Sequence, residues 1–189
     1  METRPLYGGA ISCAVANSFL DASQVRQIPD NQEVFVDTET QQSLIIELLE
    51  PVEAEDERIA RLHFEQLARD NEAAATEILK LERIPTETAT PRLPPSTTNV
   101  HVLRGNQKVA KFDEAKKMAF NTVQIMMAVV RLQQVSTDLV ISINAPVLIA
   151  SGSSDQQQQQ QESTTVLDVE KHMQEVLSEL KVNDWSLFG

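Results

Sequence analysis

The longest apolar stretch of the chain runs from Asn121 to Leu132 and follows the two-residue period of a β-strand. Two sets of apolar side chains alternate along it. One set is Val123, Ile125, Met127 and Val129, and the other is Met126, Ala128, Val130 and Leu132. Because both sets are apolar, the pattern predicts a strand that is covered on both faces. The segment Asp138–Asn144 follows after a short turn and is predicted to be its antiparallel partner.

The same reasoning predicts further elements on both sides of this pair. Gln32–Asp37 is expected to be a strand, and Ser43–Leu49 is expected to be another, although its pattern would also fit one or two helical turns. A helix is expected over Val52–Asn71, with acidic residues at its start. The composition of Glu72–Ile84 fits a helix or a strand. Asn99–Ala110 is predicted to be a hairpin that turns at residues 104–107, where Gly and Asn suit a tight turn.

The clearest helical pattern lies near the C-terminus. Thr165 and Asp168 have the spacing of a capping box. Apolar residues then recur at intervals of three and four, namely Val166, Val169, Met173, Val176, Leu177 and Leu180. We therefore predict an amphipathic helix that packs one face on the core.

Two segments are predicted to be flexible loops. Residues 85–98 contain four prolines, which exclude a continuous helix or a central strand. Residues 151–163 contain six consecutive glutamines and have nothing to bury. Neither loop divides the chain into halves with separate cores, so residues 1–189 are expected to form a single domain. The fold class that follows is α+β, with a central, mainly antiparallel sheet and helices on both faces.

Charge and composition limit the possible partners. The formal net charge is −12, which disfavours binding to nucleic acid or anionic membranes and favours a partner with a basic face, although acidity also simply aids solubility. Cys13 is the only cysteine, which excludes an intrachain disulfide and fits a reducing compartment. The N-terminal residues do not have the pattern of a signal peptide, and no apolar stretch approaches the length of a membrane span.

Motifs for catalysis or cofactor binding are missing from the sequence. The five glycines do not form a phosphate-binding loop, and His63, His101 and His172 lack partners at zinc-ligand spacing. We therefore expect no cofactor, no metal and no catalytic residue. His63 is expected to be a hydrogen-bonded structural histidine and Cys13 an inert core thiol. Abundant carboxylates usually form a solvated surface, so an enzyme that uses a carboxylate pair stays a weak third hypothesis.

Several blocks, in order along the chain, resemble one known family. They are Pro5–Ala10, Phe19–Ser23, Val25–Phe35, Ser43–Glu50, His63–Glu65, Arg131–Leu132, Thr137–Asn144 and Ser186–Phe188. In order and spacing they are similar to the Mog-type family of Ran guanine-nucleotide release factors. The resemblance implies a six-stranded, mainly antiparallel sheet with helices on both faces, an architecture also found in PsbP-like proteins. The proline-rich and glutamine-rich loops look peculiar to this chain.

The resemblance also implies a function and a binding surface. It implies binding to the small GTPase Ran, release of its guanine nucleotide, a role in nuclear protein import, and a location in the nucleus and also the cytoplasm, most simply as a monomer. The implied Ran-binding residues are Asp30, Glu33, Glu47 and Glu50, with Arg26 and Gln32 as further polar candidates. By strand periodicity alone, Glu47 would be an outward position and Glu50 a strand end. We expect two rigid strands to present the four acids together. The alternative is an adaptor of the same fold without release activity.

Overall fold

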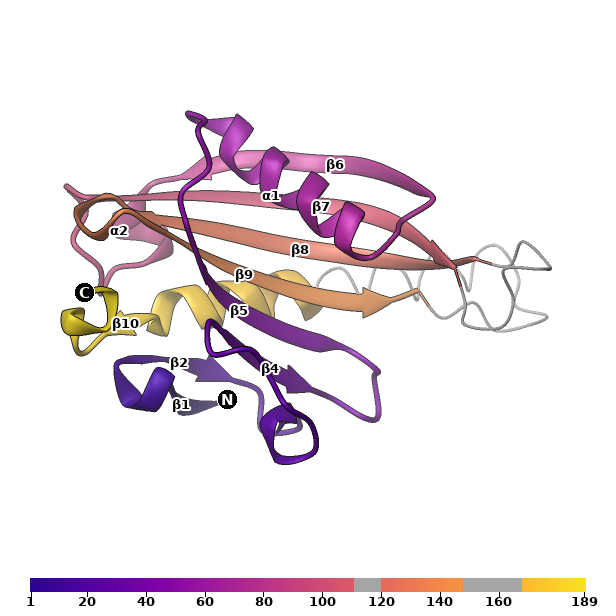
Figure 1. Cartoon of the computed structure of the whole chain (residues 1–189), viewed down its shortest axis with the longest axis horizontal. Coiled ribbons are helices and arrows are strands. Elements are labelled where there is room, and N and C mark those ends of the chain that lie inside the picture. The colour runs from indigo at the N-terminus through magenta and orange to yellow at the C-terminus, as the bar shows by residue number, and fades with distance from the viewer. Residues whose placement is uncertain (111–119, 148–167) are drawn as a thin grey trace.

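The computed structural model describes residues 1–110, 120–147 and 168–189, which form two antiparallel sheets and several helices (Figure 1). The strands are β1 (Glu2–Leu6), β2 (Ile11–Val15), β3 (Leu20–Asp21), β4 (Gln32–Val36), β5 (Ser43–Leu49), β6 (Ala75–Ile84), β7 (Thr98–Ala110), β8 (Phe120–Leu132), β9 (Thr137–Pro146) and β10 (Lys181–Val182). The helices are α1 (Glu57–Asp70), α2 (Thr86–Ala89) and a C-terminal helix that includes residues 168–179. The α+β class is thereby confirmed.

The larger sheet has the strand order β3-β4-β5-β9-β8-β7-β6, and the smaller one has the order β1-β2-β10. Every pair of neighbouring strands in both sheets is antiparallel. Six strands of the larger sheet have five or more residues and correspond to the six that the family resemblance implied. The two-residue β3 and the small second sheet are additions that the sequence patterns did not indicate.

Both faces of the larger sheet are covered, and each has its own core. On one face, Ile59 and Phe64 of α1 pack with Ile125, Met127 and Val129 of β8. The other face of the same strand packs with the C-terminal helix and the β1–β2 hairpin. That second core includes Met126, Ala128, Val130, Leu132, Val169, Met173, Val176 and Leu177. Figure 1 shows α1 and the C-terminal helix on opposite sides of the sheet. The two alternating apolar sets of β8 therefore face two different cores, as predicted.

The predicted hairpin over Asn99–Ala110 is wrong. The segment is one continuous 13-residue strand, β7, and Gly105 lies in its middle, paired with Ile78 on β6 and Ile125 on β8. The glycine is there because the Phe64 ring of α1 lies directly against it, so that a Cβ atom would be 2.7 Å from Phe64 Cζ. A glycine within a strand often marks such a close approach rather than a turn.

The segments on either side of α1 also differ from the predictions. The helix begins at Glu57 rather than at Val52, and the residues before it form an irregular connection from β5. The ambiguous segment Glu72–Ile84 contains strand β6 from Ala75 onwards. Here tertiary pairing with β7 overrides a composition that also favours helix.

The proline-rich segment contains the short helix α2 and turns. The glutamine-rich loop at 151–163 and the capping residue Thr165 lie outside the described residues. In the part of the chain that the structure describes, each helix is too short or too polar to cross a membrane.

Candidate functional site

Gln32 and Glu47 form a pair on the face of the larger sheet that α1 covers. They are directly opposite each other in the register of β4 and β5. The Gln32 amide donates a hydrogen bond of 2.6 Å from Nε2 to Glu47 Oε1. Partial burial raises the pKa of the Glu47 carboxyl, and the Gln32 hydrogen bond opposes that shift only in part. A carboxylate held in a partly desolvated position is destabilising by itself, which is a common property of binding and catalytic sites.

Glu33 points to the opposite face of the sheet. Its Oε1 atom accepts a 2.6 Å hydrogen bond from the backbone N–H of Tyr7, in the turn between β1 and β2. The Tyr7 hydroxyl donates to the Ile46 carbonyl oxygen at 2.9 Å, so the same turn is attached to β5 as well. The expectation that Glu33 is presented together with Glu47 is therefore wrong, because successive residues of β4 alternate between faces.

The other predicted residues are exposed, and two of them, Asp30 and Glu50, lie next to the ends of these strands. Asp30 lies in the turn that leads into β4, and Glu50 directly follows β5. Because β4 and β5 are antiparallel, the start of β4 and the end of β5 lie at the same end of the pair. Arg26 follows the 3₁₀ turn after β3 and is also exposed. The structure thus brings Asp30, Gln32, Glu47 and Glu50 to one end of the β4–β5 pair.

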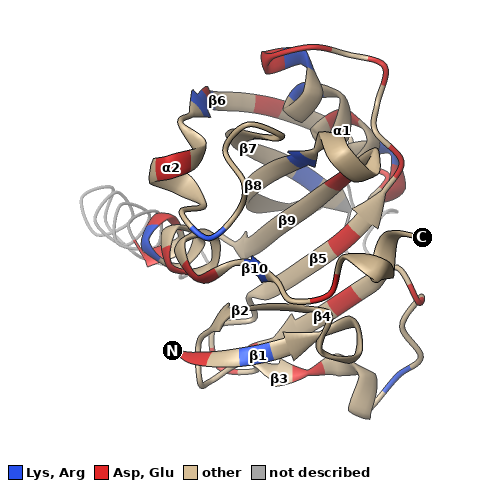
Figure 2. Cartoon of the chain, turned by 90° about the vertical axis from the view of Figure 1, so that its left-hand side faces the viewer, with Lys and Arg blue, Asp and Glu red and all other residues tan. Residues whose placement is uncertain are grey.

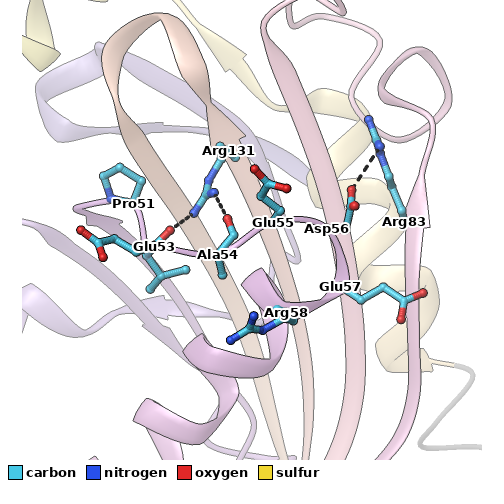
Figure 3. A pocket seen from close by; sticks show the side chains of 10 residues that line it. Pro51, Glu53, Ala54, Glu55, Asp56, Glu57, Arg58, Arg83 and Arg131 are labelled. Carbon is cyan, nitrogen blue, oxygen red and sulfur yellow. Dashed lines mark hydrogen bonds and ion pairs between the residues drawn. The ribbon is translucent and has the colours of Figure 1, made fainter.

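More acids follow in the connection from β5 to α1. We call residues 50–57, which end at the first residue of α1, the acidic connection, and its acids are Glu50, Glu53, Glu55, Asp56 and Glu57. In Figure 2 this connection, with its acidic positions, continues from the end of β5 towards α1. The connection borders an open hollow that Arg58, Arg83 and Arg131 also line (Figure 3). Glu47 and Glu50 therefore continue into a longer run of acidic residues, whereas Glu33 lies on the opposite face of the sheet.

A buried ionic network lies behind the acidic connection and was not predicted from the sequence. Asp138, whose side chain is fully buried, accepts hydrogen bonds from Arg131 Nε at 2.7 Å and Nη2 at 2.8 Å. It also bonds to His63 Nε2 of α1 at 2.8 Å. Burial alone would raise the pKa of Asp138, but the hydrogen bonds from Arg131 and His63 outweigh it and lower the pKa to about 2.

A sequence signal for this network did exist. Arg131 and Asp138 are charged residues at adjoining ends of two strands that are otherwise strongly apolar, and antiparallel strands joined by a short turn place such residues opposite each other. His63 was expected to be a hydrogen-bonded structural histidine, and its side chain is indeed buried and bonded to Asp138. His63 could not be joined to the pair from sequence because it lies on a helix far away along the chain.

Cys13 is fully buried in the core, and burial raises the pKa of its thiol to about 12. This agrees with the expectation of an inert core thiol. Within residues 1–110, 120–147 and 168–189, no group of three or more His, Cys, Asp or Glu side chains is arranged to hold a metal ion.

Comparison with known proteins places this arrangement in a family. The family model described as the Ran-interacting Mog1 protein matches residues 4–146, which is most of the chain. The chain belongs to the Ran-interacting Mog1 family. It is 37% identical over 191 residues to the Ran guanine nucleotide release factor of Danio rerio, covering 99% of this chain and 100% of the relative. It is 33% identical to the nuclear import protein MOG1 of Saccharomyces cerevisiae, covering 97% of this chain and 83% of the relative.

Solved structures of Mog1 proteins share the fold. The Ran-binding protein Mog1p of Saccharomyces cerevisiae matches with a TM-score of 0.74 and 30% sequence identity, covering 100% of this chain and 98% of that chain. An alanine variant of Mog1 matches with a TM-score of 0.73, 29% identity and the same coverage. The residues that the structure describes therefore share the Mog1 fold, and Glu47 and Glu50 lie on its strand β5 and at the start of the connection that follows.

Proposed function

We propose that this protein binds the GTPase Ran and promotes release of its bound guanine nucleotide, in support of nuclear protein import. The observation that carries the proposal is the family match over residues 4–146, together with relatives of nearly full coverage that are named Ran guanine nucleotide release factors. Other relatives are named nuclear import proteins, which supports a role in the nucleus and the cytoplasm. We propose that the protein performs no covalent chemistry.

The physical requirement for such a factor is differential binding. A protein that binds nucleotide-free Ran more tightly than nucleotide-bound Ran must, by linkage, weaken nucleotide binding by the same factor. Carboxylates suit this task because they can pair with Lys or Arg side chains that would otherwise hold phosphates or a switch segment. We propose Asp30, Glu47 and Glu50 as the main acidic contacts, supported by Gln32 and Arg26. Glu33 lies on the opposite face, and we propose that its role is indirect, in fixing the Tyr7 turn against β4.

The net charge of −12 supports a basic partner surface and opposes nucleic acid and anionic membranes as partners. We propose that the protein acts on Ran as a monomer. Encounter with a basic face would be accelerated by this charge and slowed by added salt.

The test is the rate of nucleotide release from Ran loaded with a fluorescent GTP analogue. The native chain should accelerate release, and the double substitution Glu47→Lys with Glu50→Lys should abolish the acceleration. A matched control is Glu77→Lys with Glu87→Lys, which makes the same change of charge at exposed sites on β6 and α2, at the opposite edge of the sheet. The control should retain most of the activity.

Two results would contradict the proposal. The first is a native chain that neither accelerates release nor forms a complex with Ran on size exclusion. The second is equal loss of activity in both double variants, which would indicate a general effect of charge. Complex formation without acceleration would instead support an adaptor of the same fold. Thermal denaturation of each variant shows whether the fold is intact.

A further inference from the structure

The acidic connection has little regular structure of its own, yet its backbone is bonded to the side chains of Arg131, which is partly buried, and Asp138, which is buried. Arg131 donates from Nη2 to the Val52 carbonyl oxygen and from Nη1 to the Ala54 carbonyl oxygen, both at 2.8 Å. Asp138 Oδ2 accepts from the Val52 N–H at 3.2 Å. Figure 3 shows the Arg131 guanidinium reaching this backbone from behind the hollow. The conformation of the connection therefore depends on one arginine and the carboxylate that orients it.

Holding Asp138 and the backbone of the connection at the same time requires an arginine. The guanidinium of Arg131 uses one edge to hold Asp138 through two hydrogen bonds and still has donors for two carbonyl oxygens of the connection. Its side chain is only 14% exposed. A lysine keeps the charge at the same place but has a single ammonium group, which cannot reproduce this planar fork.

The same network lies beside the predicted site on β5. Leu49 pairs with Asp138 in the register of β5 and β9, and Glu47 is two residues before Leu49, on the same face of the strand. His63 attaches α1 to Asp138 and is close enough to Glu47 to affect the pKa of that carboxyl. One set of hydrogen bonds thus connects the acidic connection and helix α1 to Asp138 of β9, the strand that pairs with the strand that carries Glu47.

We propose that Arg131 is a positioning residue of the Ran-binding surface. Through Asp138 and the backbone of residues 52–54, it holds Glu50, Glu53 and Glu55 beside Glu47, so that the acids meet basic side chains of the GTPase without first having to be ordered. This inference rests on the proposed function and adds to it. Arg131 itself is set behind the connection and acts through the residues that it holds.

The experiment compares Arg131→Lys with Arg83→Lys. Arg83 lines the same hollow, but its guanidinium is exposed and makes an ion pair of 3.6 Å with exposed Asp56 and a hydrogen bond with Asn99. Nucleotide release from Ran is measured as a function of factor concentration. Arg131→Lys should raise the concentration for half-maximal acceleration about tenfold while the maximal rate is retained, because preorganisation is lost and the contact groups are not. Arg83→Lys should change it less than about twofold.

The same substitution is then measured in a chain in which Glu50, Glu53 and Glu55 are replaced by Gln. This comparison distinguishes a positioning role of Arg131 from a general weakening of the fold. If Arg131 acts through these acids, Arg131→Lys should cost less than about twofold in that background, since coupled residues are non-additive. A tenfold cost in both backgrounds would overturn the inference, and so would an Arg131→Lys chain with native concentration dependence. Asp138→Asn is a second variant with the same expected pattern, and circular dichroism checks that each chain is folded. A native chain without release activity would refute the proposed function itself, whereas failure of the Arg131 comparison alone leaves that function standing.

Discussion

Gly105 offers a direct test of the packing between α1 and the sheet. An alanine Cβ at this position would be 2.7 Å from Phe64 Cζ, 3.0 Å from Phe64 Cε2 and 2.6 Å from the backbone oxygen of Glu77. Carbon atoms in good contact are about 3.5–4.0 Å apart, so the methyl group requires displacements of roughly 1 Å. The Glu77 oxygen belongs to strand β6 and cannot turn aside as a side chain would.

The expected cost follows from these contacts. Overpacking a core costs about 1–3 kcal/mol, and the rigid backbone neighbour favours the upper part of that range. Alanine also reduces the conformational entropy of the unfolded chain, which offsets roughly 0.5–1 kcal/mol. Gly105→Ala should therefore lower the free energy of unfolding by about 2 kcal/mol. For a chain of this size that corresponds to a decrease in Tm of roughly 4–8 °C.

Urea denaturation of four chains provides the assay: the native chain, Gly105→Ala, Phe64→Leu and the double variant. Phe64→Leu alone should destabilise by leaving a cavity, because Phe64 is only 1% exposed. In the double variant the smaller side chain leaves room for the methyl group, so the double variant should be clearly more stable than the sum of the two single effects predicts. Strict additivity, or a Gly105→Ala chain as stable as the native one, would refute the proposed contact.

Three further predictions concern the polar groups. Glu47→Gln should weaken acceleration of nucleotide release yet leave stability unchanged or slightly higher. The reason is that burial raises the pKa of Glu47, so the charged form is disfavoured in the folded chain. A clear loss of stability would argue for a purely structural role. The pKa of Asp138 is lowered from 3.8 to about 2, so its contribution of about 2 kcal/mol is complete above about pH 5 and is lost progressively as the pH falls from there through 2. Urea titrations between pH 2 and 6 should therefore show a flatter acid limb for Asp138→Asn than for the native chain, and parallel limbs would contradict the assignment. Tyr7→Phe removes the hydrogen bond to the Ile46 carbonyl oxygen and should cost about 1 kcal/mol by the same denaturation assay; an unchanged midpoint would show that the bond contributes nothing.

The position of the candidate site was only partly predictable from the sequence. The blocks Val25–Phe35 and Ser43–Glu50 do form the adjacent strands β4 and β5, and Gln32 and Glu47 do lie opposite each other. The face that each acid occupies depends on the register and on what covers the sheet. That is why Glu33, adjacent to Gln32 in sequence, is bonded to Tyr7 on the other side.

The sequence by itself determined the elements whose pattern is strong over a long segment. The alternation in Asn121–Leu132 was sufficient to predict a strand between two apolar layers, because side chains of a strand must alternate between its faces. The apolar spacing after Val169 likewise predicted the C-terminal helix that buries Met173 and Val176. The acidic composition, the presence of a single cysteine and the family resemblance were also available without coordinates.

Only the tertiary structure decided the features that depend on partners far away along the chain. Gly105 and Asn106 suit a tight turn locally, but Phe64 occupies the space above Gly105, and the segment pairs with both β6 and β8 as one continuous strand. From sequence, Arg131 and Asp138 are simply two charged residues on apolar strands. Only the fold places the connection after β5 where both can bond to it. Local sequence reports the preferences of a segment, whereas close packing and the satisfaction of buried charges are set by whichever distant groups the fold brings into contact.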